Sequence, residues 1–186
     1  MSIRDAIQQA YALLPAKMHG EAATLLLLAI RRQEDPQQLR YQRVARVPRT
    51  HPDNFIAGTE QWAKGPARGL FQMEMGGGVK GVLSHPSTAE IALNLCNHFG
   101  VLPTPGSVWR SLEGNDVLAA AFARLLLWSD SAPLPEIGEE QNAWNLYLRT
   151  WRPGAWTNGD AAQRTALRQK WATNYAAALV DLQKPA

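Results

Sequence analysis

The sequence has 186 residues, of which 46% are hydrophobic and 19% charged, so it has the composition of one globular domain with a sizeable core and not of a disordered chain. Lys and Arg number 19 and Asp and Glu 16, an excess of three that is too small and too dispersed to indicate nucleic-acid binding. The single cysteine, Cys96, excludes an internal disulfide and a cysteine-based zinc site, and the four histidines are too scattered to form a metal-ligand pair.

No segment has the features of a membrane span or a leader. The longest apolar run covers residues 22–30 and is interrupted only by Thr24, whereas about 20 apolar residues are needed to cross a bilayer. The N-terminus carries an acid at Asp5 and lacks the apolar stretch of a signal peptide. We therefore expect a soluble protein that is made in the cytoplasm.

Hydrophobic periodicity and capping residues predict a mainly α protein. The expected helices, in chain order, are 3–14, 21–34, 87–100, 105–114, 116–128, 139–151 and 160–182. Five of them begin at or just after residues suited to N-caps, namely Ser2, Ser87, Thr104, Asn115 and Asp160. The segments 21–34 and 116–128 are apolar on almost every side, which is typical of buried helices.

Two stretches do not fit a helix. Residues 44–66 contain three prolines and two glycines, and predict a long loop with a small β-hairpin in the region 44–75. Residues 75–78 include three consecutive glycines, which predict a flexible connection at the rim of a groove. No linker or internal repeat divides the chain, so we expect a single domain over residues 1–186.

Glu34 is the first candidate for catalysis, because it lies at the C-terminal end of the apolar segment 22–30. Partial burial and the negative end of a helix dipole both disfavour an ionised carboxylate and raise its pKa, and Asp35 would add like-charge repulsion. A carboxylic acid that is protonated near neutral pH is what general-acid cleavage of a glycosidic bond requires. The alternative is a surface glutamate that pairs with Arg31, Arg32 or Arg40.

Several segments around this residue resemble the lysozyme-like superfamily, in particular soluble lytic transglycosylases and goose-type lysozymes. The apolar segment ending in Glu34 is similar to their catalytic helix, and Gly65–Gln72 is similar to their Gly-Ala-x-Gly-Leu-Met-Gln element. The arrangement most resembles lysozyme-like proteins of tailed bacteriophages, through three further segments: 76–83, 115–127 and 147–154. The resemblance covers residues 20–154 and leaves 155–186 as a C-terminal helix.

This resemblance implies a lysozyme-like fold and an enzyme that cleaves the glycan strand of peptidoglycan, either as a lytic transglycosylase or as a muramidase. Glu34 would be the general acid and base, and neither a metal nor an organic cofactor is implied. Peptidoglycan would be the partner, with other virion proteins as further partners. The protein would be associated with the virion and open the cell wall locally.

The Gly65–Gln72 element supplies candidate substrate-binding residues. Gly69 permits close approach of backbone to a sugar, and the Gln72 amide can both donate and accept hydrogen bonds. Phe71 belongs to the same candidate set. The alternative is a plain turn that enters a strand, with Leu70 and Phe71 in the core.

Glu74 is the candidate second carboxylate, because it would share a face with Gln72 if residues 70–74 are extended. It would position a water or stabilise a developing positive charge. Glu60 is a further candidate for that role. The alternative for both is a solvated surface acid.

Among the aromatic residues, Trp62 is expected to bind a sugar ring, since indole presents a flat apolar face with a polar N–H. Tyr147 corresponds to a site tyrosine in the resembling families. Three tryptophans with helical spacing are expected in the core: Trp128, Trp144 and Trp171. Two others, Trp151 and Trp156, are expected to pack the chain end.

Two other functions stay open. Asp35 and Pro36 replace the serine and the residue that usually follow the glutamate in these families, which is compatible with a catalytically inactive, structural or glycan-binding virion protein. The segment 151–154 also leaves open a chitinase-like enzyme. Activity on peptidoglycan compared with chitin would separate these functions.

Overall fold

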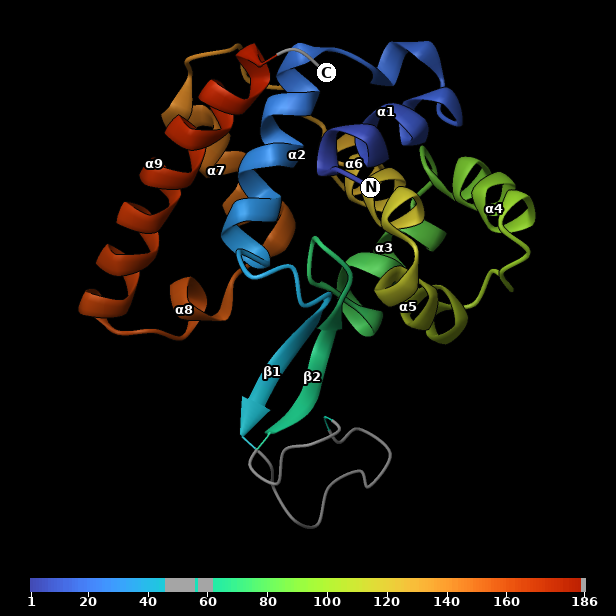
Figure 1. Ribbon diagram of the computed structural model, residues 1–186, viewed down its shortest axis with the longest axis horizontal. Coiled ribbons are helices and arrows are strands. Elements are labelled where there is room, and N and C mark those ends of the chain that lie inside the picture. Colours follow the sequence, from blue (N-terminus) through green and yellow to red (C-terminus); the bar gives the residue numbers. More distant parts are fainter. Residues whose placement is uncertain (46–55, 57–61, 185–186) are drawn as a thin grey trace.

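The computed structural model describes residues 1–45, 56 and 62–184. It shows a helical body from which a β-hairpin projects (Figure 1). The prediction of a mainly α protein with a small β region is therefore confirmed. Glu60 and most of the predicted loop 44–66 lie outside the described residues.

The helices account for most of the chain. In order they are α1 (Ile3–Ala12), η1 (Ala16–Met18), α2 (Glu21–Glu34), η3 (Met75–Val79), α3 (Lys80–Ser84), α4 (Ala89–His98), α5 (Pro105–Gly114), α6 (Asp116–Trp128), α7 (Glu140–Trp151), α8 (Gly154–Thr157) and α9 (Ala161–Gln183). Within the described part of the chain, no helix is long and apolar enough to cross a membrane.

The core is built around α2 and α6. Residues 117–127 of α6 are all buried, as is every residue of α2 from Ala23 to Arg31. Helices of this kind bury apolar side chains on all sides because other helices surround them. The long helix α9 runs beside α2 (Figure 1) and packs its buried side chains Trp171, Tyr175 and Ala178 inward.

The helix boundaries follow the capping residues closely. Ser2 and Asp160 each form a capping box, and the Asn115 side chain accepts a hydrogen bond from the backbone N–H of Leu118. The predicted capping box at Ser87 is wrong. Helix α4 begins one residue later, after Thr88, and the Ser87 hydroxyl instead lies 2.8 Å from Nδ1 of His85.

The three strands form one antiparallel sheet in the order β1-β2-β3: β1 (Tyr41–Ala45), β2 (Trp62–Arg68) and β3 (Met73–Glu74). Glu113 of α5 forms salt bridges with Lys64 and Arg68 of β2 and so attaches the hairpin to the helical body. The sheet also contacts the helical body where β2 packs against α5 and β3 packs against η3.

One local prediction is wrong in this region, and the condition attached to another is not met. Residues 75–78, which were not expected to fit a helix, form together with Val79 one turn of π-helix, η3, which continues directly into α3. Residues 70–74 are not one extended segment, because Gln72 has φ +47° and is the last residue of a turn. Strand β3 begins at the next residue, Met73. A left-handed residue reverses the chain locally and breaks the alternation of faces on which that prediction depended.

Candidate active site

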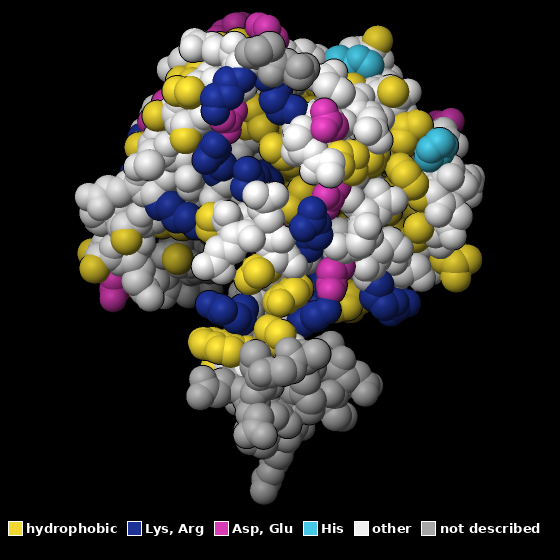
Figure 2. Space-filling model, in the orientation of Figure 1, with side chains coloured by type: hydrophobic (Ala, Val, Ile, Leu, Met, Phe, Trp, Pro, Cys, Tyr) yellow, Lys and Arg dark blue, Asp and Glu magenta, His cyan; other side chains and the backbone are white. Residues whose placement is uncertain are grey.

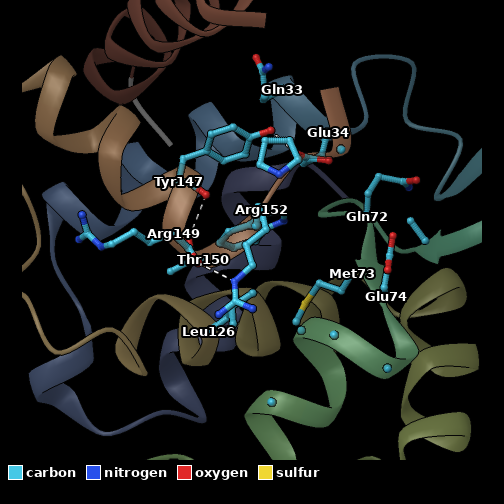
Figure 3. A pocket seen from close by; sticks show the side chains of 18 of the residues that line it. Gln33, Glu34, Gln72, Met73, Glu74, Leu126, Tyr147, Arg149, Thr150 and Arg152 are labelled. Atoms are coloured by element: carbon cyan, nitrogen blue, oxygen red, sulfur yellow. Dashed lines mark hydrogen bonds between the residues drawn. The ribbon is translucent and has the colours of Figure 1, made fainter. Parts of the chain in front are cut away.

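An open cleft of about 1000 Å³ lies where the end of α2 meets β3, η3, α7 and α9 (Figure 3). Its walls are rich in polar and charged side chains. The acidic and basic ones are Glu34, Glu74, Lys80, His85, Asp130, Arg149, Arg152 and Lys170. A cleft of this size and polarity is suited to a hydrophilic ligand such as a glycan.

Glu34 is the last residue of α2 and lines the cleft. It is only partly exposed, and most of the residues of α2 that precede it are buried. The Tyr147 hydroxyl, from α7, donates a hydrogen bond of 2.5 Å to Oε1 of Glu34. In Figure 3 the ring of Tyr147 points to Glu34, while Gln72 and Glu74 lie across the opening.

Burial raises the pKa of Glu34 to about 7. The hydrogen bond from Tyr147 and the charge of Lys170 act in the opposite direction, and the charge of Glu74 adds to the increase. Near neutral pH the carboxyl group is therefore divided between its protonated and ionised forms. Such a group can both give and take a proton, which general acid–base catalysis requires.

Tyr147 is held rigidly as a neutral donor. Its ring stacks on that of Trp171, with centroids 4.8 Å apart and an interplanar angle of 19°, and Trp144 packs at 5.5 Å. Burial raises the pKa of Tyr147 far above its ordinary value, and the neighbouring Glu34 adds to the effect. The phenol consequently keeps its proton and orients Glu34.

The surface ion pair considered for Glu34 does not form with Arg32 or Arg40. Arg32 binds Asp181 of α9, and Arg40 forms a two-pronged contact with Asp116 at 2.7 Å for both pairs of atoms. Asp35 also has a role different from the expected one. Its carboxylate accepts hydrogen bonds from the backbone N–H groups of residues 39 and 40, at 2.9 and 2.8 Å, and so shapes the chain after α2.

The structure places Gln72 and Glu74 on the wall of the cleft. The Gln72 amide donates a 2.8 Å hydrogen bond to the carbonyl of Gly69, which leaves its side-chain oxygen available. Glu74 is exposed and faces the cleft from β3. The glycines of η3 line the same wall, so the expectation that they lie at the rim of a groove agrees with their position.

Three other predicted binding residues do not line the cleft. The Phe71 side chain is 1% exposed and belongs to the core, and its carbonyl accepts a 2.8 Å hydrogen bond from the indole of Trp151. Gly69, with φ +75°, approaches the backbone of Leu112 and serves the turn. Trp62 begins β2 at the far end of the hairpin (Figure 1), where the guanidinium of Arg43 lies 4.8 Å from its ring centroid.

Sequence reasoning missed the basic side chains of the cleft, above all Lys170 of α9. The resemblance ended at residue 154, before α9 begins. A signal was nevertheless present in the sequence. Leu167 and Trp171 were expected on the face of this helix that packs inward, and Lys170 lies three residues after the first and directly before the second, which places it beside that face. Arg149 was also missed, and it is anchored by a two-pronged salt bridge to Asp130.

No group of three or more His, Cys, Asp or Glu side chains that could hold a metal ion occurs among residues 1–45, 56 and 62–184. The chain matches no family model, and comparisons with curated proteins and with solved structures likewise find no match.

Proposed function

We propose that this protein cleaves the glycan strand of peptidoglycan, with Glu34 as general acid and base. The observation that carries the proposal is the Glu34 carboxyl at the end of a buried helix, with a pKa of about 7 and an opening into a cleft of about 1000 Å³. The resemblance to lysozyme-like proteins of bacteriophages supports the same conclusion. It also supports a virion-associated role in local opening of the cell wall.

The chemistry follows from the arrangement of the two carboxyl groups. Protonated Glu34 gives its proton to the glycosidic oxygen as the bond from that oxygen to the anomeric carbon breaks. Glu74, on the opposite wall, stabilises the positive charge that develops on the sugar or orients a water. Ionised Glu34 then takes a proton from the attacking hydroxyl, which is water in a hydrolase and the muramic acid 6-hydroxyl in a transglycosylase.

The charges of the cleft suit an anionic substrate. Lys80 and Arg152 line it, whereas Arg149 is already paired with Asp130 and the Lys170 ammonium group donates to the backbone carbonyl of Gln33. On the face seen in Figure 2, basic side chains are interspersed with acidic and apolar ones and do not form one continuous patch. This distribution favours local recognition of carboxylates on a wall polymer over binding to a polyanion backbone.

The test is digestion of purified peptidoglycan by the wild type and by Glu34→Gln, with products identified by mass spectrometry. Glu90→Gln, an exposed glutamate of α4 outside the cleft, is the matched control. We expect Glu34→Gln to lose at least about 100-fold in rate while the control keeps full activity. Anhydromuramic ends would identify a transglycosylase, and reducing ends a muramidase.

The alternatives predict different outcomes. A well-folded wild type that cleaves no wall preparation would overturn the enzyme proposal in favour of a structural or glycan-binding virion protein. Cleavage of chitin without cleavage of peptidoglycan would indicate the chitinase-like function instead.

A further inference from the structure

Helix α9 holds the last turn of α2 at several points. The Lys170 ammonium group donates a hydrogen bond to the backbone carbonyl of Gln33, and Nδ2 of Asn174 donates one of 2.8 Å to the side-chain oxygen of Gln33. One residue earlier, Arg32 binds Asp181. Carbonyls in the last turn of a helix have no partner within that helix, so Lys170 satisfies one of them immediately before Glu34.

Lys170 also belongs to the cleft. Much of its side chain is exposed, but its ammonium group reaches the α2 end where Glu34 opens into the cleft. Three described ionisable groups act on Glu34 from the elements packed around it: Tyr147 from α7, Lys170 from α9 and Glu74 from β3. Tyr147 and Lys170 favour the carboxylate form, whereas Glu74 favours the acid form.

These contacts define two functions for one lysine. The hydrogen bond to Gln33 fixes the backbone that presents Glu34, and the positive charge stabilises the carboxylate that remains after Glu34 has given up its proton. Burial lowers the pKa of Lys170, and the charge of Glu34 opposes that shift. The proton that reaches the glycosidic oxygen comes from Glu34 and not from Lys170. A lysine beside a partly buried acid thereby offsets the burial that would otherwise hold the acid in its protonated form.

We propose that Lys170 is a positioning residue of the active site, which fixes the end of α2 and supports the cycling of Glu34 between its acid and carboxylate forms. This inference rests on the proposed function. It extends the site beyond residue 154 and makes α9 a part of the catalytic apparatus.

The test is a titration of Glu34 by NMR of carboxyl carbons in selectively labelled protein without substrate, combined with pH–rate profiles. We expect Lys170→Met to raise the midpoint of Glu34 by about half a pH unit, because an exposed cation is partly screened by solvent. The alkaline limit of the rate should move upward by the same amount, and kcat below that limit should fall without a matching change in KM. In Lys170→Arg, which keeps the positive charge, both the Glu34 midpoint and kcat should stay close to their wild-type values.

Two further variants serve as controls. Glu74→Gln should move the Glu34 midpoint downward, opposite to Lys170→Met, because it removes a negative charge. Lys80→Met, which removes another lysine of the cleft wall, should leave the midpoint in place.

An unchanged Glu34 midpoint in folded Lys170→Met would overturn this inference while leaving the proposed function intact. A shifted midpoint together with a wild type that cleaves no glycan would instead overturn the proposed function, and with it the role of Lys170 in catalysis. Equal shifts for Lys170→Met and Lys80→Met would also overturn the inference, since they would indicate a general effect of cleft charge.

Discussion

At the scale of single residues, the burial of Glu34 makes the stability of the fold depend on pH. Its pKa is about 7 in the folded protein and 4.5 as an ordinary glutamate. Below pH 4.5 the Glu34 carboxyl is protonated in both the folded and the unfolded states, so it does not lower the free energy of unfolding. As pH rises to about 7 the unfolded chain becomes ionised first, which lowers the free energy of unfolding until the folded form ionises as well.

This linkage predicts that Glu34→Gln stabilises the protein at alkaline pH. One pKa unit corresponds to about 1.4 kcal/mol, so the gain should approach about 3 kcal/mol above pH 8, less what a weaker bond to Tyr147 costs, and should vanish near pH 4. Urea denaturation of both proteins between pH 4 and pH 8.5 measures the difference. A stability difference that did not grow with pH would show that Glu34 titrates normally.

Tyr147 provides a second prediction at this scale. Tyr147→Phe removes the 2.5 Å hydrogen bond to Glu34 but preserves the ring that stacks on Trp171. Because that hydrogen bond favours the carboxylate, its loss should raise the pKa of Glu34 and move the alkaline limit of activity upward. The pH–rate profile of the variant checks the direction, and a downward movement would contradict the assigned role of the phenol.

At the scale of elements, two glycines on either side of β3 predict opposite effects of the same substitution. Gly69 has φ +75°, and an added Cβ would lie 2.9 Å from the backbone oxygen of Leu112. Gly76, in η3, has no atom within 4 Å of an added Cβ. Gly69→Ala should therefore cost about 1–3 kcal/mol, whereas Gly76→Ala should be neutral or stabilising by up to about 1 kcal/mol.

Thermal or urea denaturation of the two alanine variants measures this contrast. Equal destabilisation would indicate that η3 leaves its helical conformation in solution. A Gly69→Ala variant as stable as the wild type would contradict the tight turn before β3.

The elements also show what sequence patterns can and cannot predict. Helices α2, α5 and α6 begin and end where capping residues and apolar periodicity place them, because both signals are local. The π-helical turn of η3 was missed because three glycines have weak helical preference, and only packing of that turn against α3 and α5 makes it helical. The capping box at Ser87 failed for a similar reason, since His85 competes for its hydroxyl.

The residues of the candidate site also differ in how far the sequence could predict them. Glu34 could be predicted because its position at the end of an apolar helix is written in the local sequence. The resemblance indicated Tyr147 only as a site tyrosine, and its contact with Glu34, 113 residues away, was not predicted. Lys170 was missed and Phe71 was wrongly expected in the cleft, because tertiary packing decides which side chains of a helix or a turn line a cleft.

At the scale of the whole molecule, α9 joins the chain end to the candidate active site. Its Trp171 is fully buried against Tyr147 and Trp144, and Asp181 and Lys170 bind the last turn of α2. The helix therefore covers the same aromatic cluster that holds Glu34 in place. This arrangement predicts one cooperative unit, with no independently stable N-terminal part.

The prediction is that removal of residues 161–186 abolishes cooperative folding as well as activity. Without α9 the side chains of Trp144 and Tyr147 lose their cover, and Glu34 loses both its burial and its charged neighbour. The full chain should unfold in one transition that is coincident by far-ultraviolet circular dichroism and tryptophan fluorescence. A chain ending at Lys184, which retains all of α9, is the matched control and should behave like the wild type. A sharp transition in the chain that lacks 161–186 would contradict this account and show that α9 is a separate addition to an already complete fold.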